Sequence, residues 1–169
     1  MKKFLTMAAL IVLAAMTLTS CGDDEPKQTN TTATYKMTFS QDLLDVFDVY
    51  LVYKGYNGKN VPEAVNVINW SKNASCDKLP AEYGVKYIFT PKEGVTLTKE
   101  KYDLKAHFDI DITKSAGGGY HQQIVISNAG GLKKEKVLEY MEKLSGKSIG
   151  FRVSKDGGIN PDNDMNYDI

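Results

Sequence analysis

The chain is poor in cysteine, has no excess of charge of either sign and lacks a long uninterrupted apolar run. Its two cysteines are too few for a scaffold of several disulfides or for a four-thiolate zinc site. The 21 basic and 21 acidic residues balance, so the basic surface of a nucleic-acid-binding protein is not expected. With 42% hydrophobic and 25% charged residues, the 169-residue chain has the composition of an ordinary globular domain.

The N-terminal residues have the form of an export signal. Lys2 and Lys3 give a positive start, and the apolar run 4–18 is interrupted only by two threonines. A transmembrane helix needs about 20 apolar residues, so this run is short for a membrane span and typical of a secretory signal. We therefore expect residues 1–20 to be a signal peptide that the mature protein has lost.

The signal ends in Leu18-Thr19-Ser20-Cys21, which resembles the lipobox of bacterial lipoproteins. The resemblance implies that the thiol of Cys21 receives a diacylglycerol, that the chain is cut before it and that the new N-terminus is acylated. One acyl chain holds a protein at a membrane only weakly, whereas two or three anchor it stably. The alternatives are that Cys21 merely follows an ordinary signal peptide, or that it lies inside an uncleaved one.

The residues after Cys21 indicate where such a lipoprotein would go. Gly22 stands where the inner-membrane retention signal of enteric bacteria has Asp. Asp23-Asp24-Glu25 resembles the acidic export tag of surface lipoproteins of Bacteroidetes, and it equally suits the solvated start of a linker. We expect an outer-membrane lipoprotein, with the choice between the two faces of that membrane open.

The rest of the chain divides into three parts. Residues 21–33 are polar and have few large apolar side chains, so we expect a lipidated flexible tether. Residues 34–160 are expected to form the globular domain, and residues 161–169 an acidic, frayed C-terminal tail. No internal repeat is present.

The globular part has mainly the pattern of strands. The period-2 alternation is clearest over 104–113, and one segment, 133–145, has helical spacing instead. The other expected strands cover 35–39, 43–53, 64–70, 85–89, 123–127 and 149–153. We therefore predict a mostly β fold: an antiparallel two-sheet β-sandwich with one packing helix near the C-terminus.

One short motif agrees with this fold. Leu97 and Tyr102-Asp103-Leu104, just before the clearest strand, resemble the tyrosine corner of immunoglobulin-like and fibronectin-like domains. The resemblance implies a sandwich architecture and no particular activity.

A polar strand face provides the main candidate for chemistry. His107, Asp109 and Asp111 share one face of the 104–113 strand, which suits either the wet side of an amphipathic strand or a metal or acid–base site. A metal site would need a ligand from another element, and the only other histidine is His121. We expect the wet face, with no metal or other cofactor.

Aromatic residues provide a second candidate, because exposed rings can stack on sugars or anchor a protein partner. The chain has ten tyrosines and one tryptophan. Those expected at an exposed binding surface, since several lie beside glycine or turn residues, are Tyr53, Tyr56, Tyr83, Tyr120 and Trp70.

Two weaker features remain. Asp162, Asp164 and Asn166 have oxygen ligands at the alternate positions with which a calcium loop begins, but the later positions of an EF-hand are missing. Cys76 has no partner once Cys21 is lipidated, and we expect a partly buried, unreactive thiol.

Three functions follow as alternatives. The leading hypothesis is a lipid-anchored envelope domain without catalytic activity that binds a glycan or an envelope protein. A second is a small hydrolytic or metal-dependent enzyme that uses His107, Asp109, Asp111 and His121 in one pocket. The third is an accessory subunit whose exposed strand edge pairs with a partner.

Overall fold

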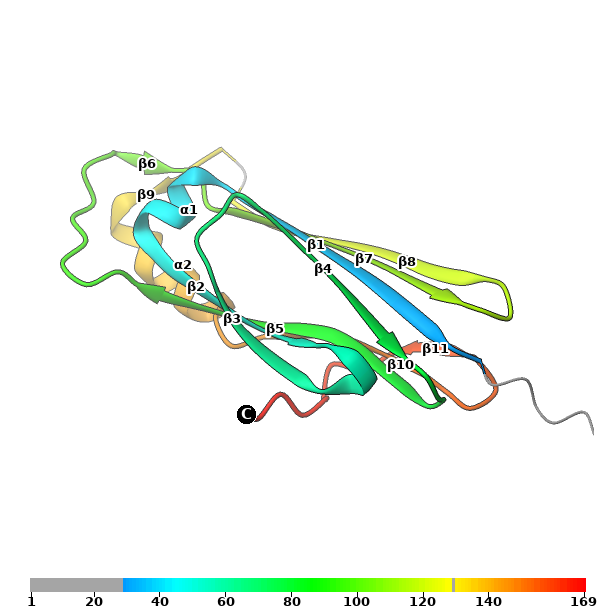
Figure 1. Cartoon of the computed structure of the whole chain (residues 1–169). Helices are drawn as coiled ribbons and strands as arrows, with labels where there is room; N and C mark the ends of the chain where they lie inside the picture. The colour runs from blue at the N-terminus through cyan, green and yellow to red at the C-terminus, as the bar shows by residue number, and fades with distance from the viewer. Residues whose placement is uncertain (1–28, 129) are drawn as a thin grey trace, which may run out of the picture.

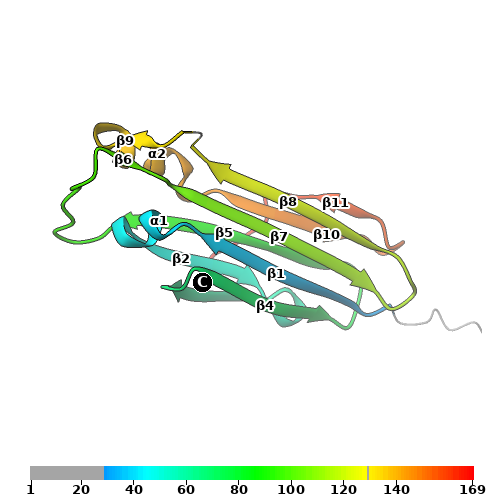
Figure 2. The same cartoon turned by 90° about the horizontal axis from the view of Figure 1, so that it is seen from above.

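Strands whose residues alternate between buried and more exposed positions form the first of the two main sheets, here called sheet A. The computed structural model describes residues 29–128 and 130–169, and the expected signal peptide, the lipobox and the acidic tag lie outside these residues. Sheet A has the strand order β4 (Asn69–Cys76), β1 (Thr31–Phe39), β7 (Lys105–Lys114) and β8 (Gly119–Ser127), all antiparallel. Figure 2 shows these four strands side by side.

Sheet B packs against sheet A and contains five antiparallel strands. The strand order is β11 (Ile159–Pro161), β10 (Ser148–Val153), β5 (Ala81–Pro91), β2 (Phe47–Lys54) and β3 (Asn60–Val65). The two layers are visible edge-on in Figure 1. The predicted two-sheet antiparallel β-sandwich is therefore confirmed.

The core lies between the sheets and is centred on Tyr35 of β1. This side chain is fully buried, stacks on Phe108, donates a hydrogen bond to the Lys54 carbonyl (2.8 Å) and accepts one from the Gly84 N–H (3.1 Å). Burial raises the pKa of Tyr35 well above its ordinary value, so the hydroxyl remains a donor. A single side chain of sheet A thus ties the backbones of two strands of sheet B.

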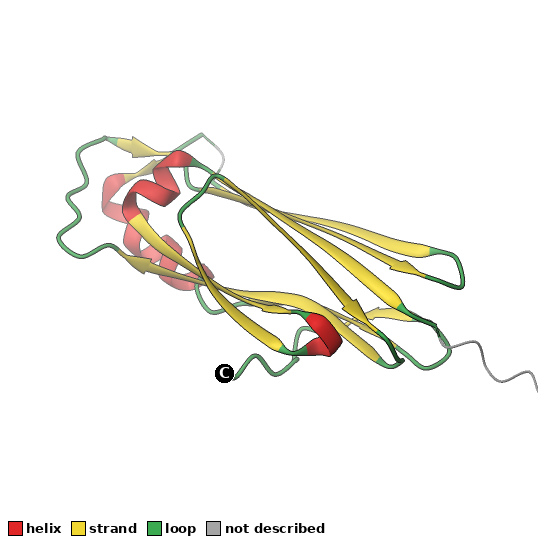
Figure 3. Cartoon of the chain, viewed as in Figure 1, coloured by secondary structure: helices red, strands yellow, loops and turns green. Residues whose placement is uncertain are grey.

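The two α-helices lie at one end of the sandwich, opposite the end where the chain enters β1 (Figures 1 and 3). They are α1 (Gln41–Val46) and α2 (Val137–Leu144), the latter preceded by the 3₁₀ turn η2 (Lys134–Lys136). The predicted C-terminal helix is confirmed. A small third sheet, of β6 (Lys101–Tyr102) and β9 (Leu132–Lys133), lies at the same end. Within the part of the chain that the structure covers, no helix is long and apolar enough to cross a membrane.

Two of the predicted strands are wrong in part. Segment 43–53 begins as α1, because Ser40 caps a helical turn by accepting from the Leu43 N–H, and β2 starts only at Phe47. Segment 64–70 is interrupted at residues 66–68, which form the turn between β3 and β4. The apolar Val67 suggested a strand here, but it lies in this turn and is 48% exposed.

Both predicted ends of the globular domain, at residues 34 and 160, differ from the observed ones. β1 begins at Thr31, inside the segment expected to be tether. The prediction of a frayed C-terminal tail is wrong for residues 161–169, because Met165 and Tyr167 are buried against Val52 on the outer face of sheet B. The tail is part of the folded domain.

Candidate functional site

Three of the five aromatic candidates are buried, so the prediction that they are exposed is wrong. Trp70 and Tyr53 face the interior and meet edge to face, with ring centroids 5.4 Å apart. Tyr83 is fully buried and its hydroxyl lies 2.7 Å from the Thr31 hydroxyl. Burial raises the pKa of Tyr83 well above its ordinary value. These rings stabilise the core and are unavailable to a ligand.

The other two aromatic candidates lie apart from each other. Tyr56 is 55% exposed in the 3₁₀ turn η1 (Tyr56–Gly58), and its hydroxyl donates to the carboxylate of Asp77. Tyr120 is half-buried on β8, where its ring packs on Phe151 with centroids 5.0 Å apart. The five candidates therefore do not form one aromatic surface.

A cavity of about 390 Å³ lies beside the η1 turn, and Cys76 is part of its wall. The remaining lining residues are Asn57, Gly58, Lys78, Pro80, Ala81 and Glu82. Cys76 is buried more deeply than predicted, and it has no disulfide partner among the described residues. Neither histidine lines this cavity, which therefore gives no support to the enzyme hypothesis.

The polar face of β7 is as predicted, and the structure adds a neighbour to it. His107, Asp109 and Asp111 are partly exposed on the outer face of sheet A, while the alternate residues are buried in the core. The β7–β8 register places His121 directly opposite Asp111. His121 Nδ1 lies 2.7 Å from Asp111 Oδ1 and 3.4 Å from Asp109 Oδ1.

This cluster contains two carboxylates and one imidazole, whose candidate ligand atoms all lie within 4.8 Å of one another. His107 is not part of the cluster. It lies elsewhere on the same face, where its Nε2 atom is buried and has no hydrogen-bond partner in the part of the chain that the structure describes. The structure therefore brings together three of the four residues of the enzyme hypothesis, on an open sheet face.

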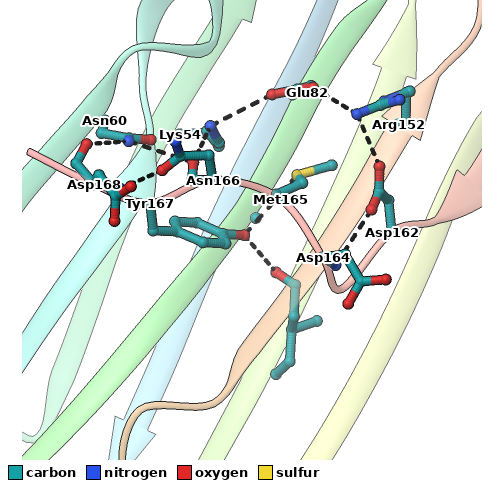
Figure 4. Close-up of polar contacts among 12 residues, drawn as sticks. Lys54, Asn60, Glu82, Arg152, Asp162, Asp164, Met165, Asn166, Tyr167 and Asp168 are labelled. Atoms are coloured by element: carbon teal, nitrogen blue, oxygen red, sulfur yellow. Dashed lines mark hydrogen bonds and ion pairs between the residues drawn. The ribbon is translucent and has the colours of Figure 1, made fainter.

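The three residues of the calcium hypothesis take part in other contacts (Figure 4). Asp162 forms an ion pair with Arg152 at 3.0 Å and also accepts from the Asp164 N–H. The Asn166 side chain accepts from the Asp168 N–H, and its own carbonyl accepts from the Lys54 ammonium. The contacts with Arg152 and Lys54 fasten the tail to sheet B, a role that the alternation of acidic residues did not indicate.

The free edge of β8 is a feature that the sequence interpretation did not single out. β8 has nine residues and, among the strands that the structure describes, pairs with β7 alone. It contains no Lys, Arg, Asp, Glu or Pro. The absence of charge over 119–127 was visible in the sequence, but nothing there indicated that this strand ends a sheet.

The other three edges of sheets A and B have features that hinder pairing with another chain. β11 has only three residues and ends in Pro161, and β3 contains Pro62. β4 carries Lys72, whose ammonium pairs with Glu63 of β3 at 2.8 Å. This ion pair joins the edges of the two sheets on the side of the sandwich away from β8.

No family model matches the chain, and neither a curated protein nor a solved structure matches it significantly.

Proposed function

We propose that this protein is a lipid-anchored component of the cell envelope with an assembly role, in which the free edge of β8 pairs with a strand of an envelope protein. The anchor is proposed from the lipobox-like Leu18-Thr19-Ser20-Cys21, and the acidic run that follows supports the outer membrane. The described chain enters the sandwich at β1, so the helical end would face away from the membrane.

The observation that carries the assembly role is the contrast between β8 and the other edges. An edge strand offers a row of backbone donors and acceptors, and proteins usually protect it with charge, proline or short length. β8 has none of these, whereas β3, β4 and β11 each have at least one. A partner strand on β8 would extend sheet A by main-chain hydrogen bonds.

Side chains on β8 supply the apolar contacts that such pairing needs. Ile124 and Ile126 are half-buried on the inner face and pack against the core. Val125 is 62% exposed on the outer face, between the polar residues Gln123 and Ser127. An alternating apolar partner strand would meet isoleucines on one face and this valine on the other.

The other two hypotheses receive less support from the geometry. Stacking on a glycan needs rings that lie on one surface, and the exposed Tyr56 stands apart from the half-buried Tyr120. The enzyme hypothesis needs both histidines in one cleft, whereas His107 and His121 lie on the outer face of a sheet.

Site-specific photo-crosslinking in intact cells tests the assembly role. A photoreactive residue at Val125 should give an adduct of discrete mass, whose partner peptide is then identified by mass spectrometry. The matched control places the same residue at Tyr50, which is 36% exposed on β2 of sheet B. Adduct formation at Val125 and not at Tyr50 would support the proposal.

A substitution that places a charge on the β8 edge provides the second part of the crosslinking test. Gln123→Lys adds an exposed charge to the middle of β8 and should abolish the Val125 adduct while leaving the fold intact. Equal labelling at both positions, or an adduct that survives Gln123→Lys, would contradict pairing at β8.

A further inference from the structure

We infer that Asp109, Asp111 and His121 form a binding site for a divalent transition-metal ion such as Zn²⁺. The site goes beyond the proposed assembly role and does not depend on it. Its three ligands come from two adjacent strands of a hairpin, two from β7 and one from β8. The third ligand, which the β7 residues alone lacked, is therefore supplied by the neighbouring strand.

One distance between donor atoms already suits a single ion, and the other belongs to a hydrogen bond that the ion would replace. His121 Nδ1 lies 2.7 Å from Asp111 Oδ1 and 3.4 Å from Asp109 Oδ1. Zinc binds imidazole nitrogen and carboxylate oxygen at about 2.0–2.2 Å, so tetrahedral ligand atoms lie somewhat over 3 Å apart. Small side-chain rotations would separate Asp111 from His121 enough to admit the ion. The strand pairing itself need not change.

Charge at the site favours a cation. Within the described ranges, no Lys or Arg forms an ion pair with either aspartate, in contrast to Asp42, Glu63, Glu82, Glu139 and Asp162. The two carboxylates project from the same face of β7, where like charges repel. A bound dication would neutralise both of them.

One oxygen of the cluster is buried without a hydrogen bond. Oδ1 of Asp109 has almost no access to solvent and accepts no hydrogen bond from residues 29–128 or 130–169, and His121 Nδ1 lies 3.4 Å from it. A carboxylate oxygen that has lost its water needs a donor or a cation in compensation. A metal ion held between Asp109 and His121 would supply it.

The donor set selects the class of metal. One imidazole nitrogen with two carboxylate oxygens suits Zn²⁺ and its neighbours among the transition metals, whereas Ca²⁺ needs six to eight oxygens. Three protein ligands leave a fourth position for water or for a donor atom of another molecule. Because the cluster lies on an open sheet face, this position faces solvent.

The test is metal binding to the full chain, purified in detergent, stripped with a chelator and free of any polyhistidine tag. Calorimetric titration with Zn²⁺ should give one site per chain, and Co²⁺ should give the visible absorption of a protein-bound, low-coordinate ion. Asp111→Asn and His121→Gln should each weaken binding more than about tenfold, as losses at metal sites commonly do.

His107→Gln is the matched control, since it removes the other histidine of the same face and no ligand of the proposed site. It should leave the affinity and the Co²⁺ spectrum unchanged, and circular dichroism should show all variants folded. Absence of Zn²⁺ binding would overturn the inference. Binding that survives both ligand substitutions, or that His107→Gln weakens equally, would do so too.

Discussion

Gly150 on β10 and Asp162 in the C-terminal tail are in direct backbone contact. The Asp162 N–H donates to the Gly150 carbonyl at 2.8 Å, and a methyl group on Gly150 would overlap the Asp162 carbonyl. The same methyl group would lie 3.0 Å from Met165 Sδ and 3.2 Å from the Tyr167 hydroxyl. The glycine therefore leaves the space in which the tail lies on sheet B.

Gly150→Ala should displace the tail and lower the free energy of unfolding by about 1–3 kcal/mol, the usual cost of adding a methyl group to a well-packed site. Chemical denaturation followed by circular dichroism measures this change. The control combines the substitution with removal of residues 162–169. Without the tail the alanine should cost little, and an undiminished cost would show that the glycine serves another purpose.

Lys54 is the main polar attachment of the tail. The Lys54 side chain is almost fully buried, and its ammonium donates to the Asn166 carbonyl at 2.7 Å (Figure 4). The same ammonium lies 3.4 Å from a Glu82 carboxylate oxygen and over the Tyr167 ring. Lys54→Met should cost about 1–2 kcal/mol of stability, because it removes a charged hydrogen bond while Glu82 keeps Arg152 as partner. The exposed Lys59 provides the control, and Lys59→Met should be nearly neutral. Equal effects of the two substitutions would contradict this role.

Asp42 should make stability depend on pH in the acid range. Burial alone would raise the pKa of Asp42, but hydrogen bonds from the Lys99 ammonium and the Asp103 N–H outweigh it and hold the pKa below its ordinary value. A lowered pKa contributes stability above about pH 4, and this contribution is lost as the pH falls through the folded-state pKa.

Asp42→Asn should therefore cost about 1 kcal/mol at neutral pH, and less as the solution is made more acidic than about pH 4. Denaturation of both proteins across this range measures the difference between them. Lys99→Met should reproduce part of the loss. A difference that stays constant down to pH 2 would show that the Asp42 carboxylate is not stabilised by these contacts.

Much of the fold could be predicted from local patterns in the sequence. The alternation in 104–113 indicated β7 and its buried face, and the helical spacing before Gly146 indicated α2. Both signals lie within one element and are set by which face is apolar. The strand prediction for 43–53 was wrong in part because apolar residues continue from α1 into β2 with only Asp45 and Asp48 among them, so no clear change of period separates the two elements.

The sites could not be predicted as fully, because they depend on which strands are neighbours. Asp109 and Asp111 were recognised on one strand, but only the β7–β8 register places His121 beside them. The exposure of Tyr53 and Tyr83 was misjudged because nearby glycines, Gly55 and Gly84, suggested turns. Gly84 instead lies inside β5, and the Tyr83 side chain points into the core.

Mass spectrometry of the N-terminus of the protein isolated from its native membranes tests the central proposal most directly. We predict a chain that begins at Cys21, with a diacylglyceryl group on its sulfur and an acylated amino group. A chain that retains residues before Cys21, or one in which the Cys21 thiol is unmodified, would contradict the lipid anchor and with it the proposed place of the protein in the envelope.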